Sequence, residues 1–243
     1  MENILIFLLL ISFISSLANV NMEILHSYPK ERNINGNEYA RLNNNTYNTC
    51  KIRNSHTTLV LSKPVIYLYP KENMDISVQL NLKNSKFTTI YPKFNRKNTW
   101  KVRAKPNGDI LINNKTYPYL FWEAKSYSPF ETNEKEGFII TEENAEKFLE
   151  EKLKILGLND KEKTDFITFW LPVLLKNKLN LCTFQSKKFF DNIELNVTPK
   201  PDSLIRVFLT IKKLDNLINI KEQKLISNER KGFTVIEWGG SKY

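Results

Sequence analysis

Hydrophobic and polar positions follow different periods in successive parts of this chain. From about residue 62 to residue 140, short runs alternate apolar and polar side chains, as in ISVQLNL at 76–82, and Pro, Asn and Gly separate the runs. Asn107-Gly108 lies between two such runs and is typical of a tight hairpin turn. This part of the chain is therefore predicted to form β-strands joined by turns.

The period changes to that of an amphipathic helix at Thr141. Apolar side chains recur at three- and four-residue spacing between Ala145 and Leu156. Thr141 is a candidate N-cap, and Gly157 can supply the left-handed residue that ends a helix. The pattern predicts a helix over residues 142–156.

A second helix is predicted next, after which the strand pattern returns. Asn159, with Glu162 three residues later, is typical of a capping box, and the apolar side chains of Phe166, Ile167, Phe169 and Trp170 follow before Pro172. Residues 177–243 contain four strand-like runs: KLNLCTF, IELNVT, LIRVFLTI and FTVIEW. The predicted fold class is α+β, with N- and C-terminal strands in a β-sandwich or mixed sheet and a helical pair over 141–176.

The N-terminal region has the pattern of an export signal. Residues 4–14 are an unbroken apolar run, shorter than the roughly 20 residues that a membrane span needs. Small side chains at Ser16 and Ala18 predict cleavage after Ala18, which makes residues 1–18 a signal peptide. A buried N-terminal helix is the alternative, because Met1-Glu2-Asn3 contains no Lys or Arg.

The rest of the chain is then expected to have two parts. Residues 19–61 are polar and rich in Asn, which predicts a poorly ordered leader, and residues 62–243 are expected to form a single module. No later segment has the length and apolarity of a transmembrane span. The expected location is outside the cell or in the lumen of the secretory pathway.

Composition limits the chemistry. The chain has 36 Lys and Arg against 26 Asp and Glu, a formal charge of +10, and loss of the signal peptide would raise the charge by one. With only 2 His and 2 Cys, neither a metal site nor a cofactor is expected. Both histidines, His26 and His56, lie in the leader, which disfavours hydrolases with a Ser-His-Asp or Cys-His arrangement.

Export would expose the chain to oxidation and glycosylation. Cys50 and Cys182 can pair as a disulfide, although Cys182 lies in an apolar run and can equally be a small buried side chain. Three Asn-X-Thr sequons are candidate glycosylation sites, at Asn44, Asn114 and Asn196.

Five motifs occur in a distinctive order: KPVIYLYP (63–70), YLFWEA (119–124), FITFWLP (166–172), TPKPDSLIRVF (198–208) and ERKGFTVIEWGG (229–240). Together they resemble a family of uncharacterised, often exported proteins of bacteria and fungi, over about residues 62–240. The family has no assigned activity, so the resemblance implies one continuous module and no mechanism.

Two acids are candidates for catalysis. Glu123 shares a strand face with Tyr119 and Phe121, and Glu237 shares one with Phe233 and Val235. An unpaired carboxylate among apolar side chains tends to have a raised pKa, as a general acid requires. Beside Trp122 and Trp238, whose rings can stack on sugars, the two would resemble a glycosidase pair. The alternative is that each glutamate is exposed at a strand end or paired with Arg206, Arg230 or a lysine.

One predicted strand lies in a segment that is rich in basic residues. Residues 93–105 contain six basic residues and no acid, and alternation places Lys101, Arg103 and Lys105 on one strand face. Such a stripe can bind an anionic glycan or an anionic surface, and export makes nucleic acid the least favoured anion. The alternative is a solvated strand face whose lysines prevent edge-to-edge aggregation.

These observations favour a secreted, cofactor-free binding protein whose ligand is an extracellular carbohydrate or polyanion. The expected ligand-binding residues are Trp122, Trp238, Lys101, Arg103 and Lys105. A glycan hydrolase using Glu123 and Glu237 as acid and base is one alternative. A structural component of an exported coat is another, and the sequence does not specify an oligomeric state.

Overall fold

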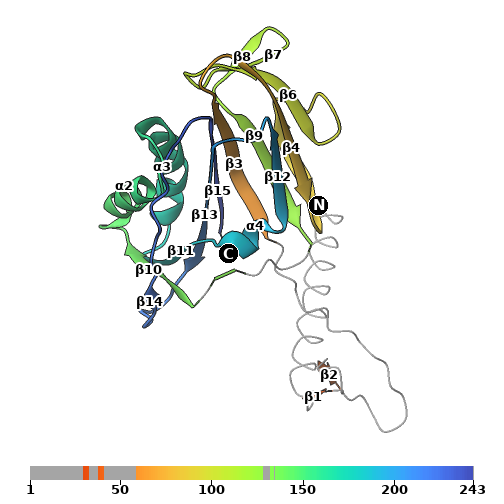
Figure 1. Cartoon of the computed structure of the whole chain (residues 1–243). Coiled ribbons are helices and arrows are strands. Elements are labelled where there is room, and N and C mark those ends of the chain that lie inside the picture. The colour runs from red at the N-terminus through yellow and green to blue at the C-terminus, as the bar shows by residue number, and fades with distance from the viewer. Residues whose placement is uncertain (1–29, 33–37, 41–58, 128–131, 134, 243) are drawn as a thin grey trace, which may run out of the picture. The chain divides into compact units, whose positions relative to one another are not determined.

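The computed structural model describes residues 30–32, 38–40, 59–127, 132–133 and 135–242 (Figure 1). Contacts divide the chain into two units, Met1–Ser55 and His56–Tyr243. In the first unit, β1 (Lys30–Arg32) and β2 (Glu38–Ala40) pair as an antiparallel hairpin. The predicted signal peptide lies outside the described residues, as do Asn44 and Cys50.

The second unit contains two β-sheets. In spatial order, the eight-stranded sheet consists of β14 (Lys221–Glu222), β10 (Glu136–Thr141), β11 (Leu179–Phe184), β13 (Ser203–Lys213), β15 (Thr234–Lys242), β3 (Val60–Tyr69), β9 (Leu120–Ser126) and β5 (Ser85–Tyr91). Its neighbouring strands are antiparallel, except for the parallel pairs β13–β15 and β10–β14. N-terminal and C-terminal strands therefore share one sheet, with β15 and β3 at their junction.

The five-stranded sheet is antiparallel throughout. It consists of β12 (Ile193–Thr198), β4 (Met74–Leu82), β6 (Thr99–Ala104), β7 (Ile110–Ile112) and β8 (Lys115–Tyr117). The predicted Asn107-Gly108 turn joins β6 to β7, and Gly108 has the positive φ of 91° that such a turn requires. This hairpin prediction is confirmed.

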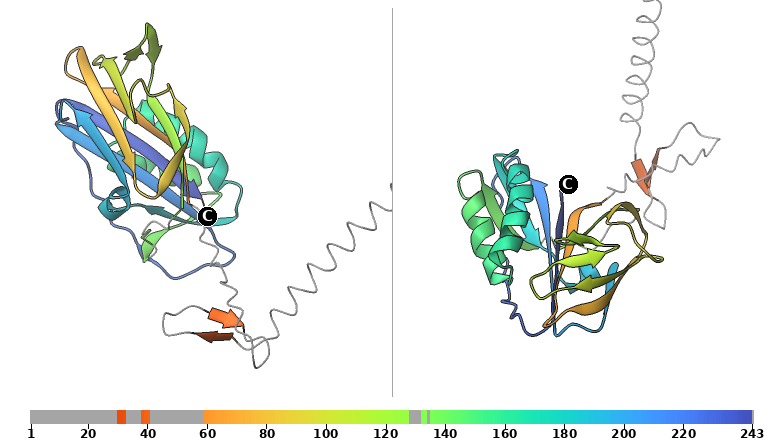
Figure 2. Two further views of the ribbon diagram at one scale, coloured as in Figure 1. Left: turned by 90° about the vertical axis from the view of Figure 1, so that its right-hand side faces the viewer. Right: turned by 90° about the horizontal axis from the view of Figure 1, so that it is seen from above.

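Two hydrophobic cores hold the second unit together. One lies between the two sheets and contains Trp100, Trp122 and the apolar side chains that alternate inward along β3, β4, β6 and β9. The other lies between the eight-stranded sheet and the helices. The right-hand view of Figure 2 shows the helices and the five-stranded sheet on opposite sides of the larger sheet. The fold is thus β-rich and sandwich-like, with 48% of the described residues in strands and 17% in helices.

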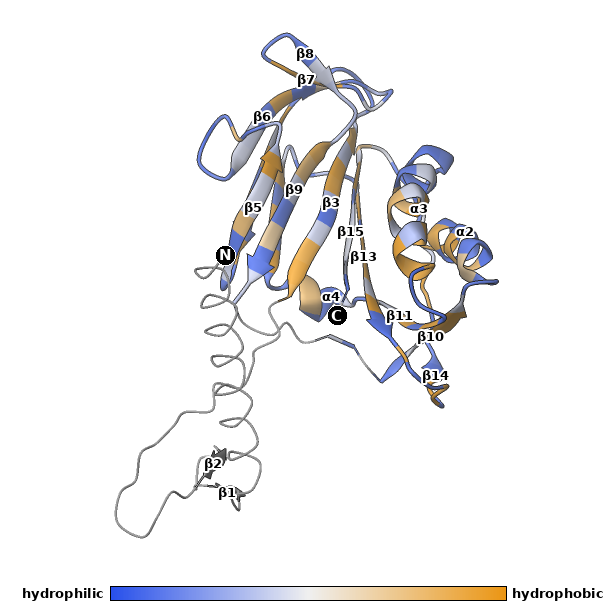
Figure 3. Cartoon of the chain, turned by 180° about the vertical axis from the view of Figure 1, so that it is seen from behind, coloured by the Kyte–Doolittle hydropathy of each residue, from blue (hydrophilic) through white to orange (hydrophobic). Residues whose placement is uncertain are grey.

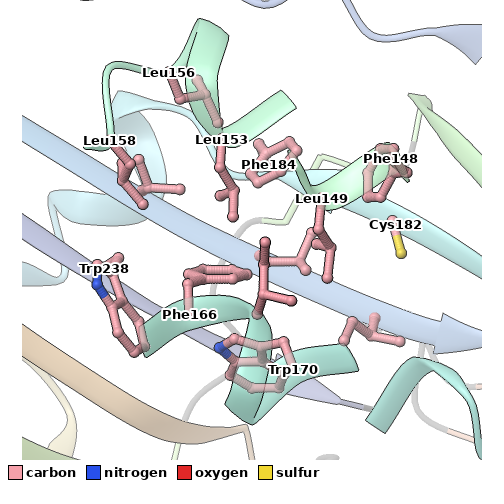
Figure 4. Close-up of a cluster of buried hydrophobic side chains, with 14 of the residues drawn as sticks. Phe148, Leu149, Leu153, Leu156, Leu158, Phe166, Trp170, Cys182, Phe184 and Trp238 are labelled. Atoms are coloured by element: carbon pink, nitrogen blue, oxygen red, sulfur yellow. The ribbon is translucent and has the colours of Figure 1, made fainter. Parts of the chain in front are cut away.

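Three helices complete the described fold: α2 (Ala145–Ile155), α3 (Asp160–Leu174) and the short α4 (Lys187–Phe190). Figure 4 shows apolar side chains of α2 and α3 packed beside Cys182, Phe184 and Trp238 of the sheet. Within the described residues, no helix combines the length and apolarity needed to cross a membrane.

The helix ends partly confirm the predictions. Asn159 and Glu162 form both hydrogen bonds of the predicted capping box, and Gly157 has the left-handed φ of 91° after α2. Thr141, however, is not the cap of α2. It is the last residue of β10, and its N–H donates to the side chain of Asn144, which is the N-cap instead.

The boundary at residue 62 was also wrong. β3 already begins at Val60, and the side chains of Leu59 and Leu61 are buried in the core between the sheets. Residues 59–61, which the sequence pattern assigned to the polar leader, therefore belong to the folded unit.

Candidate functional site

Glu237 is a buried member of an ion pair rather than a free acid. Its Oε2 accepts a hydrogen bond of 2.6 Å from Nε of Arg206, the residue opposite it on β13, and its Oε1 accepts one of 3.1 Å from Nε1 of Trp122. The carboxylate is therefore compensated by a cation inside the core between the sheets. This is the paired alternative that the sequence left open.

Glu123 has a different role, which depends on a β-bulge in the neighbouring strand. The register between β3 and β9 shifts between Leu61 and Val65, and Lys63 within this bulge has a φ of 57°. That conformation is strained for a residue with a side chain, and all the more so before a proline. The carboxylate of Glu123 accepts the N–H of Lys63 at 3.1 Å and so holds the bulge in place.

The two glutamates lie on opposite faces of the eight-stranded sheet. Glu237 contacts Trp122 on the face toward the five-stranded sheet. Glu123 lies one residue beyond Trp122 on β9, and successive side chains of a strand point to opposite faces. The structure therefore does not bring the expected acid and base together, because the two carboxylates of a glycosidase flank the scissile bond within one cleft, roughly 5–10 Å apart.

The two tryptophans expected to stack on sugars are both buried. Trp122 is 1% exposed in the core between the sheets, and Trp238 is 0% exposed beneath the helices, 5.1 Å from the ring of Phe166. A ligand outside the folded unit does not reach either ring. Both side chains fill the core, so this structure does not present either ring to a ligand.

The basic strand is exposed as predicted, but neighbouring acids reduce its charge. Lys101 and Arg103 point outward from β6. Arg103 lies 3.7 Å from Asp75, its partner on β4, and Lys105 lies 4.0 Å from Asp109. An open hollow of about 510 Å³ lies over Lys101, Arg103 and the end of β12. The stripe therefore retains one cation, Lys101, that forms no ion pair with the described residues.

A less compensated group of lysines lies on the outer face of β3, β9 and β5, and we call Lys63, Lys86 and Lys125 the lysine face. Figure 3 shows these three strands side by side, and Val65 and Tyr67 of β3 pack against the core under the helices. Lys86 and Lys125 are directly opposite each other in the β5–β9 pair, where like charges repel. Within the described residues, no carboxylate lies within 4.0 Å of any of the three ammonium groups.

Aromatic rings flank this face. The ammonium of Lys63 lies 5.3 Å from the ring centre of Tyr119, 5.1 Å from that of Phe121 and 5.8 Å from that of Phe169 on α3. These contacts fix the charge of Lys63 on this face of the sheet without neutralising it. Tyr91, the partner of Phe121 on β5, is 60% exposed and offers a ring at the surface.

Other charged groups surround Lys63. Lys161 on α3 also lies 5.9 Å from the ring of Tyr119, and it forms an ion pair of 2.9 Å with Asp165. Asp165 additionally accepts the hydroxyl of Tyr67 at 2.8 Å. Burial, followed by this hydrogen bond, raises the pKa of Tyr67, so its hydroxyl stays protonated at physiological pH. Asp165 is thus already engaged by Lys161 and Tyr67, and Glu123 accepts the backbone N–H of Lys63.

Only part of this site was predicted from the sequence. Glu123 and the aromatic motif YLFWEA were singled out, but Lys63, Lys86 and Lys125 are far apart in the chain and none lies in a run of basic residues. The register of β5, β9 and β3 brings them onto one face. Only the strand pairing identifies these lysines as a group, and no local sequence pattern shows it.

The remaining candidates are placed as follows. Asn114 lies exposed in the turn before β8, and Asn196 lies exposed on β12, an edge strand of the smaller sheet. Both positions are accessible to glycosylation. Within the described part of the chain, no three His, Cys, Asp or Glu side chains are grouped as metal ligands.

Cys182 is a buried thiol on β11, and burial raises its pKa well above the ordinary range. In a Cys50→Ser variant, where Cys182 is the only thiol, we expect no iodoacetamide adduct under native conditions at pH 8 and one adduct in urea. Intact mass measures both. Rapid alkylation of the native variant would contradict the burial of Cys182, and blocked thiols in unreduced, denatured wild-type protein would indicate a disulfide.

Comparison with known proteins gives a narrow result. No protein-family model and no solved structure matches the chain. A protein of Butyrivibrio fibrisolvens described as "Uncharacterized protein in bglA 3'region" is 50% identical over 62 residues. The match covers 25% of this chain and 64% of that relative, which is less than two thirds of the relative's length. The chain is therefore similar to an uncharacterised bacterial protein over a quarter of its length.

Proposed function

We propose that this protein is an exported, non-catalytic binding protein that takes an anionic carbohydrate polymer on the lysine face. The observation that carries the proposal is a set of three ammonium groups on one sheet face that form no ion pair with the described residues, two of them directly opposite each other on β5 and β9. Opposed like charges cost stability unless a ligand uses them. A polymer with regularly spaced carboxylate or sulfate groups would neutralise them.

Aromatic side chains favour sugars among the anions. Tyr91 is exposed beside Phe121, and Lys63 lies next to Tyr119 and Phe169. Rings stack on the apolar faces of sugars while lysines bind the acidic substituents, as the surface of an acidic polysaccharide requires. The expected export of the chain supports an extracellular glycan over nucleic acid.

No observation on the described residues supports either alternative function, the glycan hydrolase or the coat protein. The hydrolase lacks its pair of carboxylates, because Glu237 is ion-paired and Glu123 lies on the other face of the sheet. The coat protein would need a self-association surface, and no specific feature of the described residues points to one.

Replacing the lysine face tests the proposal. In a Lys63→Gln/Lys86→Gln/Lys125→Gln variant, we expect the affinity for heparin and for polygalacturonate to fall at least about tenfold at low salt, because the counterions released on binding come from these contacts. Isothermal titration calorimetry measures the affinity. Dextran, which is neutral, should not bind measurably to either protein.

A matched variant separates this surface from the basic strand. Lys101→Gln/Arg103→Gln removes two exposed cations from β6 of the smaller sheet and should change the affinity by less than about twofold, because neither residue is on the lysine face. Thermal unfolding should show both variants folded, and loss of the Lys86–Lys125 repulsion should not destabilise the first. The proposal would be refuted if the two variants lost affinity equally, or if the wild type bound neither heparin nor polygalacturonate.

A further inference from the structure

A second surface, separate from the lysine face, has the features of a small-ligand site. An open hollow of about 990 Å³ lies between α4, β12 and β13. Its lining includes the apolar side chains of Phe190, Ile193, Leu195 and Leu204, together with Arg206. Leu204 is 44% exposed, so apolar surface is left open to solvent in the hollow. Binding sites for small molecules typically combine such apolar lining with few polar groups.

Arg206 is held rigidly in the wall of this hollow. Its Nε donates to Glu237 at 2.6 Å, one Nη1 hydrogen donates to the carbonyl of Ile193 at 2.8 Å, and the guanidinium lies 4.2 Å from the ring centre of Phe190. These contacts come from three different elements. The guanidinium therefore has a fixed position before any ligand arrives.

Part of the hydrogen-bonding capacity of Arg206 is unused. A guanidinium has five N–H donors, and Nε and one Nη1 hydrogen account for two of them. Nη2 is buried and donates to no acceptor in the described part of the chain. A buried donor without an acceptor is costly, so a bound molecule or ion is its ordinary explanation.

We propose that this hollow binds a small monocarboxylate with an apolar chain. The carboxylate accepts the free Nη hydrogens of Arg206, since two parallel N–H groups match the two oxygens of a carboxylate. The apolar chain lies against Leu195 and Leu204. Reaching Nη2 requires a small adjustment of the wall, because this atom is covered in the free protein.

Charges at the rim distinguish this site from the lysine face. Lys83 and Lys187 are balanced by Asp191 and Glu194, and Arg206 is balanced by Glu237. The hollow has no net charge to attract polyanions over a distance. Binding should therefore depend weakly on salt, whereas binding at the lysine face depends on it strongly.

Trp122 provides a reporter that is built into the site. Its indole N–H donates to the same carboxylate that holds Arg206. A carboxylate ligand on Arg206 competes for the guanidinium and changes the hydrogen bond of Trp122. The other three tryptophans serve as internal references, because Trp100 donates to the carbonyl of Pro92 and Trp170 and Trp238 lie in the other core.

The experiment is a titration of the 15N-labelled full-length chain with hexanoate and octanoate, followed by the four indole resonances. We expect a saturable shift of the Trp122 resonance, tighter for octanoate, and small shifts of the other three. Hexan-1-ol, which lacks the carboxylate, should give no saturable shift. A shift of equal size with the alcohol would overturn the carboxylate assignment, and no shift with either acid would overturn the site.

Three variants complete the test. Leu204→Glu puts a negative charge in the hollow and should weaken octanoate binding at least about tenfold. Leu217→Glu is the matched control, because Leu217 is 77% exposed and does not line the hollow, and it should bind as the wild type does. Arg206→Lys keeps a cation beside Glu237 but lacks the fork of donors, and it should also lose at least about tenfold. Unchanged binding by Leu204→Glu would overturn the proposal.

Discussion

Replacement of Glu237 by alanine is expected to lower the free energy of unfolding by about 3–5 kcal/mol, because it leaves the guanidinium of Arg206 buried without its counter-ion. Both side chains are shielded from solvent, with 14% of Arg206 and 4% of Glu237 exposed. The variant also removes the acceptor of the Trp122 indole N–H. Urea denaturation followed by circular dichroism measures the change.

A double variant tests whether the cost comes from the unpaired charge. Arg206→Met/Glu237→Leu removes both charges and fills similar volume, and it should recover most of the stability lost by Glu237→Ala. Glu123→Ala is the comparison among the acids. It removes a half-buried acceptor of one backbone N–H and should cost about 1–3 kcal/mol. A loss below about 1 kcal/mol for Glu237→Ala would contradict the structural role assigned to this residue.

Trp238→Ala should destabilise the protein by a similar amount, about 3–5 kcal/mol, because it leaves a large cavity under the helices. Trp238 is fully buried and packs against Phe166 of α3 and Tyr67 of β3. Trp238→Phe keeps an aromatic ring in this space and should cost much less. Denaturant unfolding of the two variants gives the comparison.

The same variant separates a core role from a ligand-binding role. Below its unfolding transition, Trp238→Ala should bind heparin as the wild type does, because the lysine face lies on other side chains. A selective loss of glycan binding with little loss of stability would show that Trp238 contacts ligand, and would contradict its assignment to the core.

Local signals in the sequence predicted local structure well. The capping box at Asn159 and Glu162, the turn at Gly108 and the alternation along β6 each depend on residues within a few positions of one another. Thr141 was misassigned as a cap because Asn144, three residues later, competes for the same role and the strand continues to Thr141.

The candidate site was only partly predictable because its residues meet through strand register. Alternation within each strand placed Glu123 and Glu237 on apolar strand faces. It does not show whether these two strand faces lie on the same side of the sheet. Asp75 neutralises Arg103 from a neighbouring strand, and Lys86 meets Lys125 across another pair. The bulge that directs Lys63 toward the rings depends on both neighbours of β3, since its registers with β9 and β15 both shift there.

The central claim is that an anionic glycan occupies the outer face of β3, β9 and β5. Lysine acetylation with and without saturating heparin, read by mass spectrometry residue by residue, tests it most directly. We expect heparin to slow acetylation of Lys86 and Lys125 at least about fivefold and to protect Lys63 as well, while Lys101 reacts at an unchanged rate. Protection of Lys101 with no protection of Lys86 and Lys125 would contradict the account.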